Sequence, residues 1–345
     1  MKSILIAGAV LDRDRVPLYR GRGYRLFKTL YSSACRMDCR YCPFSCFSRV
    51  ERESWDRESL VNTFLSSYRA GRVDGLFLTS SIYADPDTVV ERQLEVLAGV
   101  RRRGYTGYIH LRLMPGVSRS LVSYAALLAD RAGLNIEAPR SIFTELAPSK
   151  GDWLQDIVKR IEWLVQARKR LEERRGPGCL SRGIDTQLVL GAAGESDLEV
   201  LETAWMLLRI GVNRIYVSRF KPFKTTPLEH RPPEKPSRAL RVMQAIELMR
   251  AYRYNLHELK QLLDENNMLP NMDPKVLFAE ANPGFFPVDP NTDPEWRLLR
   301  VPGIGPRTAR MIIRARDRGE KITWSTLEKI MGRKRLMRAA KYLVL

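Results

Sequence analysis

Three cysteines near the amino end of the chain have a spacing suited to metal chemistry. Cys35, Cys39 and Cys42 follow one another as CxxxCxxC, and they are three of the five cysteines in 345 residues. Thiolates are the usual protein ligands of iron–sulfur clusters. Three of them bind three irons of a cubane and leave the fourth open, as catalytic metal sites require. The spacing therefore predicts a [4Fe–4S] cluster with one open iron.

Zinc is the alternative, with Cys46 as a fourth ligand. Structural zinc sites usually place two ligand pairs further apart, so the cluster is favoured. Cys46 is otherwise either a packed thiol or a functional one, and we expect Cys179 to be structural. The chain has no apolar run of membrane-spanning length and no secretory signal, so we expect a cytoplasmic protein without disulfides or a membrane contact.

Strand-like and helix-like segments alternate around the cysteines. The six repeats predict an α/β fold, a partial (βα)6 TIM-like barrel over residues 1–222. Active sites of such folds lie at the carboxyl ends of the strands, and the cysteines follow the first strand. The predicted strands are 27–33, 75–80, 107–113, 134–138, 186–191 and 214–220, and the predicted helices are 56–69, 86–103, 153–173 and 197–209.

Polar side chains alternate with apolar ones in two of these strands. His110 and Arg112 share one face, as do Asn135 and Glu137. A parallel strand packed on both faces reads instead as continuous apolar sequence. One face of the sheet is therefore expected to line a polar cavity, with a buried, internally paired network as the alternative.

A proline-rich segment, 223–237, separates the barrel from a helical domain over 238–345. Within about 293–345, the sequence predicts a helix, a tight turn and a second helix opened by Pro306, with Asp293 and Pro294 starting the first. A second turn is expected at 331–333, with a capping box from Ser325 to Glu328. Backbone N–H groups at such a turn bind phosphate without reading bases. The candidate nucleic-acid-binding residues are Gly303, Ile304, Gly305, Arg307, Thr308, Arg310 and Arg314.

Positive charge is concentrated at the same end of the chain. The formal net charge is +19, and residues 301–345 contain 12 basic and 3 acidic side chains. This distribution favours a polyanionic partner. A solvated, arginine-rich surface and a hairpin used for protein contact are the alternatives.

The cysteine spacing, with Tyr41 before the third cysteine, resembles the radical S-adenosylmethionine superfamily. The resemblance implies that the open iron binds S-adenosylmethionine and that an electron, from a donor such as a ferredoxin or flavodoxin, cleaves it. A 5′-deoxyadenosyl radical then abstracts hydrogen from substrate. By the same resemblance, the cofactor-binding residues are Tyr41, Ser80, Ser81, Asn135, Glu137, Gly191 and Gly194.

Two of these assignments depart from the superfamily or leave an alternative open. Ser80 and Ser81 stand where the superfamily often has a GGE-like element, but serines replace the glycines and no acid follows. Gly191 and Gly194 would let the backbone approach adenine. Their alternative is a tight turn into a helix capped near Ser196.

Cysteines and hairpin together resemble the family of radical S-adenosylmethionine proteins assigned to DNA modification or repair. Further matching segments are 28–30, 111–116, 135–139, 191–195 and 285–289. The family implies a nucleic-acid substrate, DNA ahead of RNA, and a glycosylase-like partner. A target base would have to be flipped or single-stranded. His110, Arg112 and Tyr31 are the candidate residues of that pocket.

Two other functions remain open. One is modification of tRNA or rRNA by a radical enzyme. The other is a non-catalytic DNA-binding protein with a structural cluster, as in endonuclease III-like glycosylases. There, four cluster cysteines follow the hairpin, whereas here three precede it by more than 250 residues.

Overall fold

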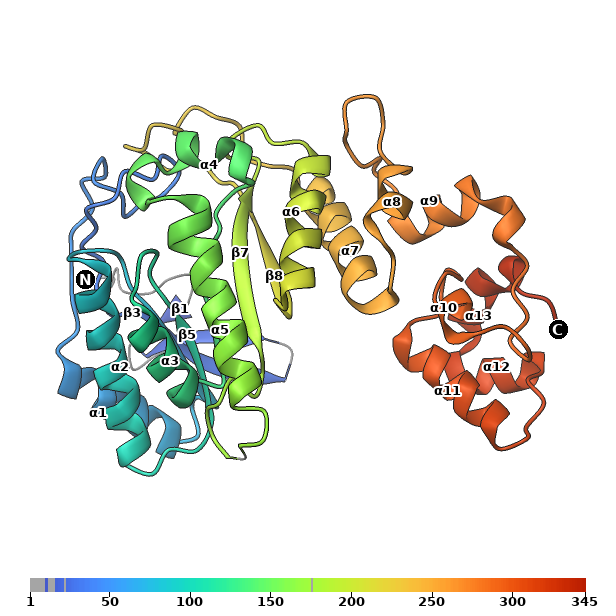
Figure 1. Ribbon diagram of the computed structural model, residues 1–345, viewed down its shortest axis with the longest axis horizontal. Helices are drawn as coiled ribbons and strands as arrows, with labels where there is room; N and C mark the ends of the chain where they lie inside the picture. The colour runs from blue at the N-terminus through green and yellow to red at the C-terminus, as the bar shows by residue number, and fades with distance from the viewer. Residues whose placement is uncertain (1–9, 12–15, 22, 175) are drawn as a thin grey trace. The chain divides into compact units, whose positions relative to one another are not determined.

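A computed structural model describes residues 10–11, 16–21, 23–174 and 176–345, and these fold into two compact units (Figure 1). The first comprises the described residues up to 195 together with 207–234. The second comprises 196–206 and 235–345. The chain therefore passes between the units after residues 195, 206 and 234.

One eight-stranded sheet forms the first unit, with its strands in sequence order. β1, β2 and β3 pair antiparallel, and every pair from β3 to β8 is parallel. The six parallel strands confirm the predicted partial barrel. The bounds are β1 Val10–Leu11, β2 Pro17–Gly21, β3 Tyr24–Leu30, β4 Gly75–Thr79, β5 Tyr108–Arg112, β6 Arg131–Gly133, β7 Ile184–Leu190 and β8 Arg214–Arg219.

Helices cover the outer face of this sheet, with α1, α2, α3 and α5 as successive neighbours (Figure 1). Asp56 caps α1 by accepting from the N–H of Ser59 at 2.9 Å, and Asp85 caps α2 in the same way. The bounds are α1 Arg57–Arg69, α2 Pro86–Arg102, α3 Arg119–Leu128, α4 Arg140–Leu146, η1 Pro148–Lys150, the π-helical η2 Trp153–Val158 and α5 Lys159–Arg170. Helix α6, Asp197–Ile210, begins in the second unit and ends in the first.

The two faces of the sheet differ as the alternation predicts. Phe27 of β3 packs edge-on against Phe64 of α1, with ring centroids 5.8 Å apart. Phe27 and the residues on the same side of the sheet therefore face the helices. The alternate positions face the barrel interior. There Lys28, Phe77 and His110 are partners in register across β3, β4 and β5.

The predicted strand over 134–138 is wrong. β6 ends at Gly133, and the backbone at Glu137 has φ 60°, a left-handed conformation that a strand does not contain. The segment still runs beside β7, because the N–H of Val189 donates to the carbonyl of Glu137 at 2.7 Å. The antiparallel pair β1 and β2 was not predicted.

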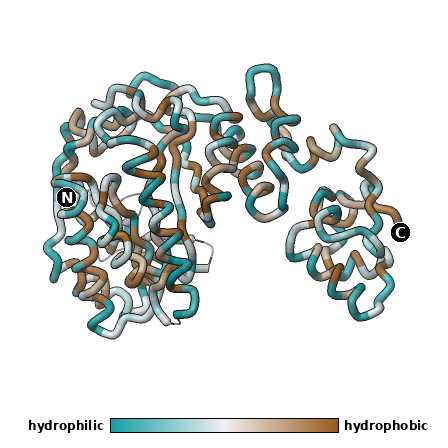
Figure 2. The backbone as a smooth tube through the Cα atoms, viewed as in Figure 1, coloured by the Kyte–Doolittle hydropathy of each residue, from teal (hydrophilic) through white to brown (hydrophobic). Residues whose placement is uncertain are grey.

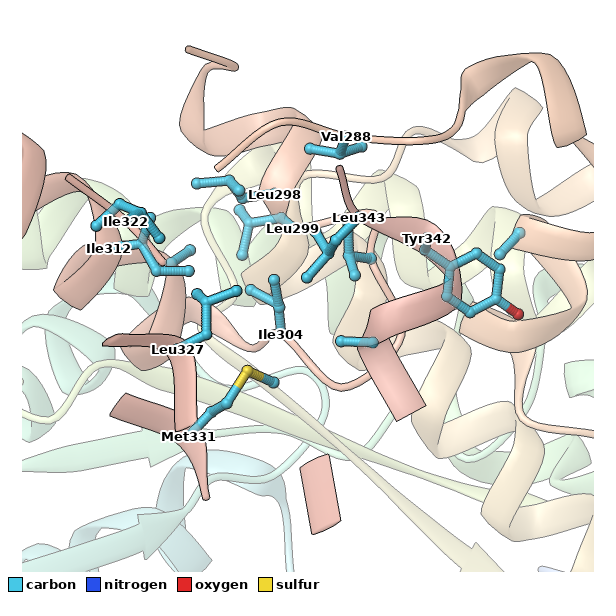
Figure 3. Packing of buried hydrophobic residues seen from close by; sticks show 14 of the residues in the cluster. Val288, Leu298, Leu299, Ile304, Ile312, Ile322, Leu327, Met331, Tyr342 and Leu343 are labelled. Carbon is cyan, nitrogen blue, oxygen red and sulfur yellow. The ribbon is translucent and has the colours of Figure 1, made fainter. Parts of the chain in front are cut away.

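The second unit is helical. Its bounds are α7 Pro236–Tyr252, α8 Leu256–Lys260, α9 Pro274–Ala281, η3 Pro283–Phe285, α10 Glu295–Leu298, α11 Pro306–Asp317, α12 Trp324–Met331, α13 Arg333–Ala339 and η4 Ala340–Tyr342. A buried apolar cluster that includes Leu298, Ile304, Ile312 and Leu327 joins its last helices (Figure 3). Along the chain, apolar segments alternate with polar ones (Figure 2), as helices with one buried face require.

Two helix starts in this unit differ from prediction. Pro294, rather than Asp293, is the cap of α10. The side chain of Thr323 caps α12 by accepting from Thr326, so the predicted capping box at Ser325 is wrong. The side chain of Asp293 instead binds Arg297 at 3.0 Å.

Candidate active site

A cavity of about 370 Å³ lies at the carboxyl ends of the parallel strands of the first unit. This volume is within the range of pockets that hold small molecules and cofactors. Strand ends and the loops after them line it: Lys28, Leu30, Cys35, Met37, Cys39, Tyr41, Cys42, Phe44, Phe77, Thr79, Ser80, Ser81, Ile82, Arg112, Leu113, Met114, Pro115, Asn135, Glu137, Lys150 and Gln187.

All three predicted cluster cysteines line this cavity as free thiols, whereas Cys46 is exposed and does not line it. Within the described residues, no three His, Cys, Asp or Glu side chains converge on one metal-ion position. A cubane does not need that convergence, because each cysteine binds a different iron. The placement of Cys46 outside the cavity speaks against a fourth zinc ligand.

Two contacts that the sequence did not reveal hold the cysteine loop. The guanidinium of Arg52 donates to four loop carbonyls, including those of Ser33 at 2.9 Å and Ser45 at 2.8 Å. Asp38, between the first two cysteines, accepts from the hydroxyl of Ser149 at 2.7 Å. The loop therefore has a fixed shape although it contains no helix or strand.

Burial keeps two of the cysteines protonated when they have no bound cation. It raises the pKa of Cys39 to about 12 and the pKa of Cys42 to about 11. A thiolate is the ligand form, and a metal cation compensates the charge that burial disfavours. Cys39 and Cys42 are therefore better suited to bind a metal than to act as free reactive thiols.

Glu137 and Lys150 form a buried ion pair at the edge of the cavity. Burial lowers the pKa of Lys150, but the charge of Glu137 outweighs it and the net shift is upward. The second carboxylate oxygen of Glu137 is buried without a hydrogen-bond partner among the described residues, as is Oδ1 of Asn135. Unpaired buried polar atoms in a cavity wall are suited to binding a polar ligand.

Asp185 is fully buried behind the cavity and binds two predicted site residues. Its carboxylate accepts from Arg112 at 2.8 Å and lies 3.1 Å from Nε2 of His110. Despite burial, Arg112 and His110 lower the pKa of Asp185 to about 2. Burial lowers the pKa of His110, which stacks on Phe77 with ring centroids 4.2 Å apart. This is the internally paired network that the sequence left open as an alternative.

The predicted residues therefore divide into two groups. The cavity is lined by the three cysteines, Tyr41, Ser80, Ser81, Arg112, Asn135 and Glu137. Four others lie outside that lining: Tyr31, His110, Gly191 and Gly194. Tyr31 lies one residue beyond the end of β3 and stacks on Tyr83, with the ring centroids 6.5 Å apart.

The segment of Gly191 and Gly194 forms a tight turn, as the alternative interpretation had it. Both glycines have positive φ, 89° and 84°. Glu195 accepts from the N–H groups of Gly191 and Ala193. Ser196 then caps α6 by accepting from the N–H of Glu199 at 3.2 Å.

In the second unit, the turn between α10 and α11 is held from inside. Gly303 has φ 94°, and a Cβ there would lie 2.9 Å from the carbonyl oxygen of Arg335. The ammonium of buried Lys275 donates to the carbonyl of Ile304, and burial lowers the pKa of Lys275 to about 7. The side chains of Ile304 and Thr308 are buried, so these two residues offer only backbone groups to a ligand.

Helix α11 presents three arginines at its surface. Arg307, Arg310 and Arg314 are exposed at a spacing that places them on one helix face. The first N–H groups of this helix, such as that of Thr308, have no intrahelical partner, and no side chain caps them.

Comparison with solved structures shows the fold. The chain is similar to the HydG maturase of [FeFe]-hydrogenase (14% identity, TM-score 0.51, 65% of this chain and 49% of that one). It is similar also to HydG from Carboxydothermus hydrogenoformans (16%, TM-score 0.52, 65% and 51%), and to methylornithine synthase PylB (17%, TM-score 0.48, 64% and 62%). The chain thus spans about half the length of the HydG chains. No family model and no curated protein matches it.

No helix in the described part of the chain is long and apolar enough to cross a bilayer.

Proposed function

We propose that this protein is a radical S-adenosylmethionine enzyme. In this proposal Cys35, Cys39 and Cys42 hold a [4Fe–4S] cluster, and the cavity they line receives S-adenosylmethionine. The supporting observation is that the three cysteines of the CxxxCxxC motif open into one cavity at the carboxyl edge of a curled parallel sheet. The bound group would supply one-electron chemistry that abstracts hydrogen.

The residues present fit such a ligand. Asn135 Oδ1 and the free oxygen of Glu137 are acceptors without partners among the described residues, and they suit ribose hydroxyls or an ammonium. The backbone strain at Glu137, with φ 60°, is of the kind that functional sites retain. Apolar lining side chains such as Met37, Phe44 and Ile82 would keep water from the reacting centre.

Iron and sulfide content after anaerobic reconstitution tests the cluster. The wild type should bind about four irons per chain. Cys35→Ser, Cys39→Ser and Cys42→Ser should each lose most of the iron and the cluster absorption. Cys46→Ser is the matched control, because this thiol lies in the same loop but outside the cavity. Full iron in all three cavity variants would contradict the assignment.

We further propose that the substrate is a nucleic acid, DNA ahead of RNA, bound through the second unit. The exposed face of Arg307, Arg310 and Arg314, beside the uncapped start of α11, supports this. So does the excess of basic residues in 301–345. Backbone N–H groups and arginines are the usual phosphate contacts of proteins that bind without reading bases.

Binding to duplex DNA, single-stranded DNA and tRNA across a salt series distinguishes the remaining options. Tightest binding to tRNA would favour RNA modification. Binding to DNA by a protein that loads its cluster but never cleaves S-adenosylmethionine would favour the non-catalytic DNA-binding function. If none of the three binds in a salt-dependent manner, a nucleic-acid substrate is excluded. A ferredoxin or flavodoxin as reductant, a glycosylase-like partner and a cytoplasmic location complete the proposal.

A further inference from the structure

Among the described residues that line the cavity, Lys28 is the charged side chain without an acidic partner. It lies in the middle of β3 and lines the cavity. Its ammonium lies 5.2 Å from the ring centroid of Phe77 and 5.3 Å from that of Tyr19. Among the residues that the structure describes, no carboxylate forms an ion pair or hydrogen bond with it.

The other charged side chains that line the cavity are already paired. Arg112, the neighbouring cation, binds Asp185 at 2.8 Å, and Asp185 also binds His110. The cavity carboxylate, Glu137, is paired with Lys150. The cations Lys28, Arg112 and Lys150 thus outnumber by one the two carboxylates that pair with them, those of Glu137 and Asp185. Arg131, which also acts on Asp185, adds to this positive field.

The electrostatics of Lys28 agree with a missing anion. Burial and then the charge of Arg112 lower its pKa to about 8. A bound anion would oppose both effects, since an opposite charge nearby favours the protonated amine. Contacts with two aromatic rings stabilise a cation but do not neutralise it.

Depth separates Lys28 from the cluster loop. β3 ends two residues after Lys28, at Leu30, and the cysteines follow after a further loop. At about 3.3 Å per residue, Lys28 is about 7 Å below the rim of the sheet. The cysteines, Ser80 and Ser81 lie at that rim.

We propose that Lys28 receives a carboxylate or phosphate carried by the end of the substrate that enters the cavity first. This inference rests on the proposed function, because it takes the cavity as the active site. It narrows the substrate class. An internal backbone phosphate of a nucleic acid stays outside when a base enters, so the anion belongs to a terminal phosphate, an acidic base substituent or a small acid.

Site-specific amine acylation, read by mass spectrometry, tests the anion site without any turnover. Inorganic phosphate and acetate are the probes, S-adenosylmethionine alone is the third arm, and exposed Lys159 is the internal control. A bound anion that raises the pKa of Lys28 by one unit slows its acylation at pH 7 about tenfold. We expect this with phosphate or acetate, and no change at Lys159.

Variants connect the anion site to binding. Lys28→Met should weaken phosphate binding at least tenfold, Lys28→Arg should stay within about threefold of wild type, and Lys159→Met should match wild type. Equal acylation of Lys28 with and without both probes would overturn the proposal. Protection by S-adenosylmethionine alone would also overturn it, because the anion would then be the cofactor carboxylate. If phosphate protects Lys28 but the protein never cleaves S-adenosylmethionine, the anion site stands and the proposed function fails.

Discussion

The guanidinium of Arg112 lies 2.8 Å from the carboxylate of Asp185, two strands away in the curled sheet. Asp185 is the only acid that Arg112 contacts among the described residues, and neither side chain is more than slightly exposed. The pair fixes the orientation of a cavity-lining cation and joins β5 to β7 across the short strand β6.

Removing the charge of Asp185 should destabilise the first unit. Asp185→Asn leaves Arg112 buried without its acid, and we expect a loss of about 3 kcal/mol in the free energy of unfolding at pH 7. Asp74→Asn is the control, because Asp74 pairs with Arg25 at an exposed position and should change stability little. Urea denaturation measures both. An equally small loss of stability in Asp185→Asn and Asp74→Asn would contradict a structural role for the buried pair of Arg112 and Asp185.

The stability difference between wild type and Asp185→Asn should depend on pH in the direction set by the lowered pKa of Asp185. The folded pKa of Asp185 is about 2, below its unfolded value of about 3.9. The carboxylate therefore stabilises the fold above about pH 4, and this contribution is lost as pH falls toward 2. The stability gap between wild type and Asp185→Asn should narrow on acidification. A gap that widens would show that Asp185 is not the titrating group.

Asp185 also shows how far the sequence could predict this site. Asp185 and Gln187 share one face of β7, a signal like that of His110 and Arg112 but weaker, because Thr186 between them is polar. The strand was predicted to begin at 186, so its first polar residue was missed. The error was one of boundary, the least reliable part of a sequence pattern.

Other features leave no mark in the sequence. Glu137 has a left-handed backbone where it hydrogen-bonds to β7, and a residue pattern does not encode this conformation. The pairing of Glu137 with Lys150 joins segments that only the fold brings together. By contrast, the cysteine motif and the polar faces depend on local spacing, and these were predictable because spacing determines them.

Glu137 should matter for binding of S-adenosylmethionine. Glu137→Gln removes the charge of a carboxylate in the cavity wall, and we expect the Kd of the reconstituted protein for S-adenosylmethionine to rise at least tenfold, about 1.4 kcal/mol. Equilibrium dialysis measures it. Glu145→Gln is the control, because Glu145 is 66% exposed and lies 3.8 Å from Arg40. Unchanged affinity in Glu137→Gln would remove this residue from the site.

The arginine face of α11 should determine the salt dependence of nucleic-acid binding. Replacing Arg307, Arg310 and Arg314 by Ala should reduce the slope of log K against log salt by up to about 3. Removing three exposed arginines of the first unit, Arg69, Arg102 and Arg170, changes net charge equally. That control should leave the slope nearly unchanged. The same loss in both triple variants would point to net charge rather than to this face.

Two glycines of the second unit should respond differently to substitution. Gly303→Ala adds a Cβ 2.9 Å from a backbone oxygen at φ 94°, whereas Gly332→Ala, at φ 78°, meets nothing within 4 Å. We expect a loss of about 2 kcal/mol or more for the first and about 1 kcal/mol for the second. Hydrogen exchange of the α11 and α13 amides measures it. A larger effect at Gly332 would contradict the packing of the turn.

Formation of 5′-deoxyadenosine tests the central claim most directly. The reconstituted protein is incubated anaerobically with S-adenosylmethionine and a strong reductant, and the product is quantified by mass spectrometry. We predict 5′-deoxyadenosine from the wild type and from Cys46→Ser, and none above background from Cys39→Ser. A fully iron-loaded wild type that forms no 5′-deoxyadenosine under any reducing condition would contradict the account, as would equal product from Cys39→Ser.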